Sequence, residues 1–151
     1  MVPLFYLDTS VFGGYFDEPF REATRAFWAE LVEGRCRAVV SRLTVAELVP
    51  APAEVRELLE SLAAEQLTIV DLTDEMQVLA DRYVSEGVVG PAYRTDAVHV
   101  AAATVGDAKA VLSWNFKHLV NLRKIEAFNG INLLMGYRPI DIRTPGEVLA
   151  S

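Results

Sequence analysis

Cysteine, histidine and long apolar stretches are scarce in this sequence. Its 151 residues include one cysteine, Cys36, and two histidines, which excludes an internal disulfide framework and a metal site built from several cysteines. No apolar run reaches the ~20 residues that a membrane span requires. The first residues, Met1 to Leu4, carry no charged leader. We therefore expect a cytoplasmic protein without a membrane segment, folded as a single domain over residues 1–151.

Basic residues are outnumbered by acidic ones. The chain has 14 lysines and arginines against 21 aspartates and glutamates, a formal net charge of −7. This disfavours uniform adhesion to nucleic acid or to an anionic membrane. Residues 1–75 hold 14 acids and 6 bases, whereas residues 76–151 hold 7 acids and 8 bases. The second half carries either a local basic face or scattered solubilising charges.

Short apolar segments alternate with helical patterns along the chain. We expect buried strands at residues 3–7, 38–40, 67–70, 110–114 and 131–134. Helical patterns cover residues 19–33, a short segment that Thr44 caps, 54–66, 73–86, 94–105 and a last turn at 145–149, with a loop around residues 9–14. Apolar strands alternating with helices predict an α/β fold, in which helices flank a central, mostly parallel five-stranded sheet.

Polar side chains follow several of these strands. Asp8 comes directly after the first strand, Glu47 lies just past the second, and Asp96 is in the first turn of the helix before the fourth. Asn115 follows that fourth strand. Ligands of such sheets bind outside the carboxyl ends of the strands. Hard oxygen ligands at one point favour Mg²⁺ or Mn²⁺, and without a cation the three carboxylates would raise at least one pKa among them.

Each of these residues also has a purely structural interpretation. Asp8 can cap a turn or a helix, and Glu47 can be the second half of a capping box with Thr44. The helix dipole favours Asp96 whatever its function, and Asn115 can shape a turn. Their shared position in the predicted topology favours the functional interpretation.

Four segments carry a resemblance to a known family. In order and spacing they resemble the four motifs of PIN-domain nucleases; the segments are residues 7–11, 41–48, 95–103 and 113–119. The match spans about residues 3–135. In length and layout the chain looks most like the VapC-type toxins of toxin–antitoxin pairs. The resemblance implies a three-layer PIN-like fold.

The same resemblance implies an Mg²⁺- or Mn²⁺-dependent endoribonuclease with one or two metal ions. By motif position, Asp8, Glu47 and Asp96 would be catalytic metal ligands, directly or through water, and Asn115 would be the fourth residue of this set. Asn115 occupies a position where the family often has aspartate, and a further acid is often found near the position of His118. Fewer anionic ligands weaken a metal site, so a catalytically weak or inactive RNA- or protein-binding module is the alternative.

The chemistry of RNA cleavage suggests further roles. Hydrolysis needs an activated water and stabilisation of charge on the phosphate oxygens; Glu47 can act as the general base. Thr9 or Ser10 would give the site a hydroxyl or a backbone N–H. Trp114 either stacks on a base or belongs to the core. The candidate basic track for the RNA strand consists of Arg94, Lys117, Arg123 and Lys124.

The two histidines have alternative roles. His99 lies three residues after Asp96, so both can share a helix face; it is a partner of a metal ligand, a ligand of a softer metal, or a structural residue bonded within the fold. His118 either replaces the missing acid or caps a short helix after Asn115.

The absence of a glycine-rich phosphate loop argues against a phosphatase of small molecules.

Partners are also expected. The mid-chain helices have more apolar residues than one core face needs, which predicts a homodimer; these residues are Val49, Leu58, Leu59, Leu62 and Ala63. The toxin resemblance implies a small antitoxin that covers the site and places an arginine among its carboxylates.

Overall fold

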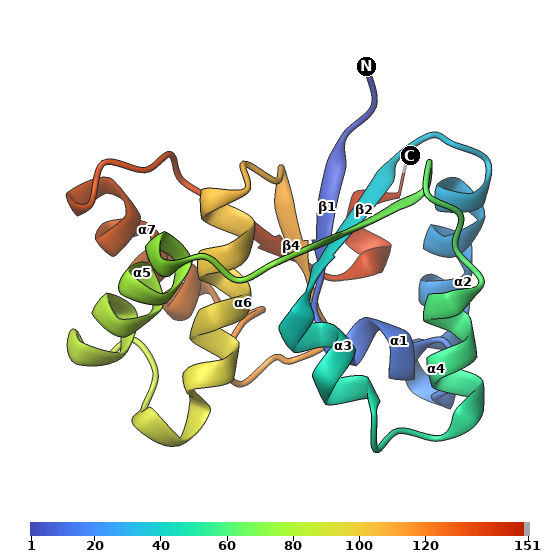
Figure 1. Cartoon of the computed structure of the whole chain (residues 1–151), viewed down its shortest axis with the longest axis horizontal. Coiled ribbons are helices and arrows are strands. Elements are labelled where there is room, and N and C mark those ends of the chain that lie inside the picture. Colours follow the sequence, from blue (N-terminus) through green and yellow to red (C-terminus); the bar gives the residue numbers. More distant parts are fainter. Residues whose placement is uncertain (150–151) are drawn as a thin grey trace.

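The computed structural model describes residues 1–149 as a three-layer α/β fold (Figure 1). Residues 150 and 151, the end of the single domain predicted over 1–151, lie outside the described residues. Five strands form one sheet in the order β3-β2-β1-β4-β5, and each pair of neighbours is parallel. The predicted fold class is therefore confirmed. The strands are β1 (Leu4–Leu7), β2 (Arg37–Ser41), β3 (Leu67–Val70), β4 (Ala110–Leu112) and β5 (Asp141–Arg143).

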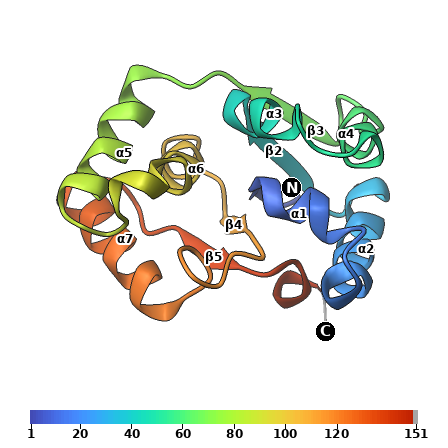
Figure 2. The same ribbon diagram turned by 90° about the horizontal axis from the view of Figure 1, so that it is seen from below.

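Helices cover both faces of this sheet. They are α1 (Thr9–Gly14), α2 (Glu18–Val32), α3 (Arg42–Leu48), α4 (Ala53–Glu60), α5 (Asp74–Ser85), α6 (Arg94–Val105) and α7 (Leu122–Leu134), with 3₁₀ turns η1 (Pro91–Tyr93) and η2 (Pro145–Val148). Figure 2 shows α5, α6 and α7 on one side of the sheet and α1, α2 and α4 on the other. Alternation along β1 serves both cores, because Tyr6 packs with the first group and Phe5 and Leu7 with the second.

The fifth strand was placed wrongly by its sequence pattern. Residues 131–134 are the last turn of helix α7, whose buried positions include Phe128 and Asn132. The strand β5 lies later, at Asp141–Arg143, and only its central Ile142 is buried. A short apolar run does not distinguish a strand from a buried helix turn, and here Asn121 starts the helix by accepting hydrogen bonds from two backbone N–H groups.

Other boundaries also differ from the predictions. The expected loop at residues 9–14 is the helix α1, which Asp8 caps. The helix predicted over 54–66 ends at Glu60, and the strand predicted over 110–114 ends at Leu112, so that Ser113 and Trp114 lie beyond it. None of the described helices has the length and apolar character needed to cross a membrane.

Candidate active site

Asp8 lies at the carboxyl end of the central strand β1 and is almost fully buried. Its carboxylate accepts hydrogen bonds from the backbone N–H of Ser10 and from the Ser113 hydroxyl, the latter at 2.6 Å. The residue is thus the cap of helix α1 and also a charged group at the sheet edge. Because β1 and β4 are parallel neighbours, the residues that follow them, Asp8 and Ser113, are brought together.

Glu47 reaches the same edge from helix α3. Its Oε1 accepts a hydrogen bond from the Thr9 hydroxyl at 2.6 Å and pairs with His99 Nε2 at 2.6 Å. The capping box predicted with Thr44 is wrong, because α3 begins at Arg42 and Ser41 is its cap residue. Glu47 is therefore free of a helix-capping role, and its side chain is directed to groups from two other elements.

A buried chain of polar groups holds Glu47 from behind. His99 Nδ1 lies 2.7 Å from the Tyr6 hydroxyl, which in turn lies 2.8 Å from the Ser41 hydroxyl. Tyr6 and Ser41 are fully buried and His99 is 2% exposed. Every polar atom of this chain has a partner, as buried polar groups require.

Within this series of hydrogen-bonded groups, the charged residues are His99 and Glu47. Burial disfavours the imidazolium, but the Tyr6 oxygen and the carboxylates of Glu47 and Asp8 outweigh it and raise the pKa of His99. Partial burial raises the pKa of Glu47, but hydrogen bonds from His99 and Thr9 outweigh that effect and hold the pKa below its usual value. At neutral pH the two groups therefore form an ion pair.

Asp96, in the first turn of α6, is the third carboxylate. Burial and then the negative charge of Asp8 raise the pKa of Asp96. Glu47 adds to this increase, whereas His118 and His99 oppose it. The structure thus brings the three predicted carboxylates into one electrostatic neighbourhood, and Asp96 is the member whose ionised form is least favoured.

The carboxylates fit a divalent cation only in part. Within residues 1–149 no three His, Cys, Asp or Glu side chains lie close enough together to hold a metal ion as they stand. The Oε1 atom of Glu47 forms hydrogen bonds with His99 and Thr9. The Asp96 side chain, by contrast, has no hydrogen-bond partner among the described residues. A nearby cation would lower the raised pKa of this carboxyl group. Asp8 and Asp96 have the donor chemistry of a magnesium or manganese ligand.

Asn115 forms a turn. Its side-chain oxygen accepts hydrogen bonds from the backbone N–H groups of Lys117 at 3.2 Å and His118 at 3.0 Å. The short helix expected after it is absent, because residues 116–119 are turns. The structural interpretation of Asn115 is thus realised, and its side-chain oxygen is engaged on the loop that carries His118.

His118 lies beside Asp96 without a polar partner for one of its nitrogens. Its Nδ1 is buried and forms no hydrogen bond with the described residues. Its ring packs against that of Tyr93, with centroids 4.0 Å apart and planes 33° apart. His118 opposes the increase in the pKa of Asp96, so it belongs to the surroundings of the site. The turn that Asn115 forms provides no hydrogen bond to its Nδ1.

The four predicted RNA-binding residues have different surroundings. Arg94 donates to Asp81 and Gln77, both at 2.8 Å, and the Lys124 ammonium donates to the Val88 carbonyl at 2.5 Å. The ammonium of Lys117 lies 5.8 Å from the centroid of the Tyr93 ring. Among the described residues, Arg123 and Lys117 form no side-chain ion pair, so these two remain available to a phosphate.

Two further residues of the site had no individual signal in the sequence analysis. Ser113 joins Asp8 to the β4 loop, because its hydroxyl donates to Asp8 and accepts from the Asn115 N–H at 2.9 Å. Tyr6 was part of an apolar run and is instead the centre of the polar chain behind Glu47. Trp114 is half-buried and belongs to neither core cluster: its ring stacks on Phe20, with centroids 4.4 Å apart, and its indole N–H donates to the Thr24 hydroxyl at 3.0 Å.

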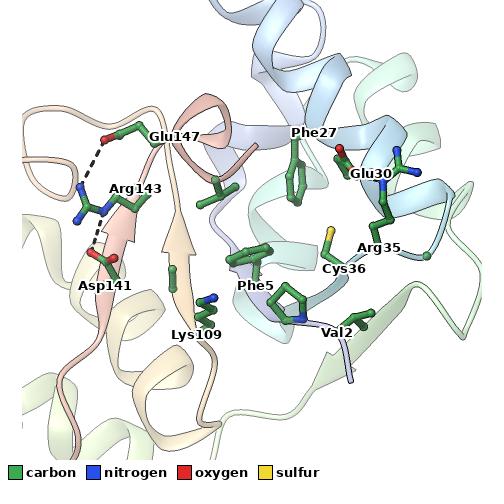
Figure 3. A pocket seen from close by; sticks show the side chains of 14 residues that line it. Val2, Phe5, Phe27, Glu30, Arg35, Cys36, Lys109, Asp141, Arg143 and Glu147 are labelled. Carbon is green, nitrogen blue, oxygen red and sulfur yellow. Dashed lines mark hydrogen bonds and ion pairs between the residues drawn. The ribbon is translucent and has the colours of Figure 1, made fainter. Parts of the chain in front are cut away.

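A separate cavity lies away from these groups. It has a volume of about 930 Å³ and is lined by residues at the amino ends of the strands, among them Pro3, Cys36 and Lys109 (Figure 3). Asp8 and Ser113 follow the opposite, carboxyl ends. Burial raises the pKa of the Cys36 thiol to about 11, so the thiol is not poised as a nucleophile. The carboxylate cluster therefore lies outside this cavity.

The sequence and the fold were compared with known proteins. The family model described as PIN domain matches residues 5–117. The chain belongs to the PIN domain family. This confirms the resemblance that the four motifs indicated. The matched segment includes Asp8, Glu47, Asp96 and Asn115. No curated protein matches the sequence.

Two solved structures share the PIN fold with this chain. One is VapBC2 from Rickettsia felis bound to a DNA fragment from their promoter, with a TM-score of 0.55, 16% identity, and coverage of 76% of this chain and 89% of that one. The other is FitAcB from Neisseria gonorrhoeae, with a TM-score of 0.59, 15% identity, and coverage of 93% and 97%. At these identities the likeness concerns the fold.

Proposed function

We propose that this PIN-domain protein is an Mg²⁺- or Mn²⁺-dependent endoribonuclease and the toxin of a toxin–antitoxin pair. The observation that carries the proposal is the position of Asp8, Glu47 and Asp96 at the carboxyl edge of the sheet, where burial and then the charges of Asp8 and Glu47 raise the pKa of Asp96. Neighbouring negative charges in a partly buried site are unfavourable without a cation. The likeness in fold to VapBC2 and FitAcB supports the proposed toxin role.

In this proposal Asp8, Glu47 and Asp96 are the residues that would hold the metal. The bound metal would polarise the phosphate and activate a water molecule. Glu47, oriented by His99 and Thr9, accepts the proton of the attacking water. Asn115 supports the site through its turn, and the Oδ1 that we predicted as a ligand would have to exchange backbone partners for the metal.

Four residues support this machinery in different ways. Thr9 donates to Glu47, and the Ser10 hydroxyl accepts from the Trp114 N–H at 2.9 Å. His99 and His118 act on the carboxylates through charge. Lys117 and Arg123 are the basic residues best placed for phosphate, because the other two candidates have partners inside the protein.

The alternative is a PIN-domain module that binds RNA or protein without cleaving RNA. Its support is that Oε1 of Glu47 and Oδ1 of Asn115 already have hydrogen-bond partners. Cleavage of a mixed tRNA and rRNA pool separates the two functions. We would assay the purified protein with Mn²⁺, with Mg²⁺ and with EDTA, beside the variant Asp96→Asn.

Asp96→Asn is a sharper variant than Asp8→Asn, because Asp8 also caps helix α1. The matched control is Asp107→Asn, which makes the same chemical change at the turn before β4. Asp107 has a φ of 61°, and asparagine adopts that conformation readily. We expect metal-dependent cleavage by the wild type and by Asp107→Asn, and none by Asp96→Asn. If Asp96→Asn retains full cleavage, the metal-nuclease mechanism is wrong.

The partners belong to the same proposal. Leu58, Leu59 and Leu62 pack against the core, which accounts for part of the apolar excess behind the predicted homodimer, while Val49 remains 67% exposed. We propose a homodimer that includes Val49, a cytoplasmic location and a small antitoxin that covers the carboxylates. Light scattering at micromolar concentration tests the dimer, and a monomer mass would contradict it.

A further inference from the structure

Tyr93 presents an aromatic ring at the surface next to the carboxylate cluster. It ends η1 and is 42% exposed. Asp96 lies three residues further on, in the first turn of α6, and His118, whose ring packs on Tyr93, also acts on Asp96. Single exposed aromatic residues are common on protein surfaces, and the position of Tyr93 becomes informative only through its neighbours.

The ring of Tyr93 is held in place by packing against His118. The imidazole of His118 packs on it with centroids 4.0 Å apart, and His118 is anchored by the turn that Asn115 forms. A tyrosine held in this way loses little conformational entropy when a ligand stacks on it. The protein therefore provides a preorganised aromatic platform, consisting of Tyr93 and His118, at the edge of the site.

A cation without an ion-pair partner lies over the Tyr93 ring. The Lys117 ammonium is 5.8 Å from the ring centroid and forms no ion pair with the described residues. Arg94, the neighbour of Tyr93 in sequence, is instead paired with Asp81. An aromatic ring next to a cation is the combination that single-stranded nucleic acids use, because the ring stacks on a base and the cation contacts the phosphate.

We propose that Tyr93 stacks on an unpaired base of the RNA substrate, next to the cleaved phosphate, while Lys117 contacts the neighbouring phosphate. The inference rests on the proposed function and adds to it a requirement for a single-stranded segment. Bases inside a duplex are already stacked on each other and do not reach the ring. Trp114 is less suited to this role, because one face of its ring is stacked on Phe20 and its indole N–H is bonded to Thr24.

The test measures binding of a fluorescein-labelled single-stranded RNA of mixed sequence by fluorescence anisotropy. All proteins carry Asp96→Asn, so that the RNA stays intact. We expect Tyr93→Leu to weaken binding about tenfold or more, since stacking on one base has that effect. Tyr93→Phe should stay within about twofold, because the ring and not the hydroxyl is required. Tyr137→Leu is the matched control, a tyrosine that bonds Glu75 away from the site.

Two further probes exclude a merely structural effect of Tyr93→Leu. An abasic RNA should bind the parent protein and the Tyr93→Leu variant equally, because no base is left to stack. In the otherwise wild-type chain, Tyr93→Leu should raise KM more than it lowers kcat. Lys117→Met should reduce the slope of log affinity against log salt by about 0.7, the value for one phosphate of a single strand.

The outcomes separate the inference from the proposed function. If the Asp96→Asn parent does not bind RNA and the wild type does not cleave it, the proposed function is wrong. If it binds RNA and Tyr93→Leu binds equally well, the function stands and the stacking role is overturned. The same follows if Tyr93→Phe is as weak as Tyr93→Leu, or if the loss persists with the abasic RNA.

Discussion

The two sides of the carboxylate cluster are built differently. On the α3 side, Glu47, His99 and Tyr6 form a chain in which each polar group has a partner. On the α6 side, Asp96 accepts no hydrogen bond from the described residues and His118 Nδ1 is buried without one. One side thus resembles a structural network, whereas the other carries an electrostatic cost that a ligand would remove. Function is expected where the fold leaves this cost in place.

The largest expected effect distinguishes the two histidines. His99→Ala should lower the free energy of unfolding by about 3 kcal/mol, because it removes a buried ring and takes one hydrogen-bond partner from each of Tyr6 and Glu47. His118→Ala should lower it by less than about 1 kcal/mol, since no hydrogen bond is lost. Urea denaturation of the two variants checks this. Equal losses would mean that the two sides do not differ in their structural importance.

The pH dependence of stability should identify the α3 side as an ion pair. The pKa of His99 is raised in the fold, so its contribution is complete below its unfolded pKa of about 6.5 and is lost as the pH rises through the folded-state value. The pKa of Glu47 is lowered, so its contribution is complete above about 4.3 and is lost as the pH falls through the folded-state value.

We therefore expect the difference in melting temperature between the wild type and His99→Gln to be largest between about pH 4.3 and 6.5. Melting scans across that range and up to alkaline pH test it. The control is His118→Gln, whose difference from the wild type should vary less with pH. A difference for His99→Gln that is the same at every pH would contradict the ion pair.

On the α6 side the expected effect has the opposite sign. Ionised Asp96 is disfavoured in the fold, so Asp96→Asn should raise the free energy of unfolding of the metal-free protein, by roughly 1 kcal/mol. The gain should shrink as the pH falls toward about 4, because Asp96 is then protonated in the wild type as well. Addition of Mn²⁺ should stabilise the wild type but not the variant.

Thermal scans with EDTA and with Mn²⁺ give these differences, and Asp107→Asn provides the baseline for the same change elsewhere. A loss of stability in Asp96→Asn without metal would show that the carboxylate is structurally required. The unfavourable character that we assign to the α6 side would then be wrong.

The smallest expected effect concerns Asn115. Asn115→Asp keeps the acceptor of the turn and should change the free energy of unfolding by about 0.5 kcal/mol or less, while Asn115→Ala removes it and should cost about 1 kcal/mol. If the position also contributes to a metal site, Asn115→Asp should bind Mn²⁺ more tightly in calorimetry. Weaker binding by the aspartate variant would limit Asn115 to the turn.

The proximity of the three carboxylates was easier to predict from the sequence than the boundaries of the helices and strands. Asp8, Glu47 and Asp96 could be identified because parallel strands bring their carboxyl ends to one edge, a rule that needs only approximate strand positions. The partners of Glu47 could not, because Thr9 and His99 are 38 and 52 residues away in the chain. A capping box was the local alternative, and the true start of α3 at Arg42 excluded it.

Residues whose role depends on strand register were missed for the same reason. Tyr6 reaches Ser41 only because β1 and β2 pair with Tyr6 opposite Val39. The final strand was misplaced because its three residues contain one buried side chain, Ile142. So weak a pattern is easily outweighed by the more apolar run at the end of α7.

The central position of β1 has a consequence for the synthesis of the protein. The first strand of the chain pairs on one side with β2 but on the other with β4, and Asp8 meets Ser113 across 105 residues. Contacts of such long range form late in folding, because a long loop must close first. A nascent chain on the ribosome thus carries Asp8 long before Asp96 and Ser113 have been made. The proposed nuclease would reach its active arrangement only after nearly all of the chain has left the ribosome, so the surrounding RNA is not exposed to a partly made enzyme.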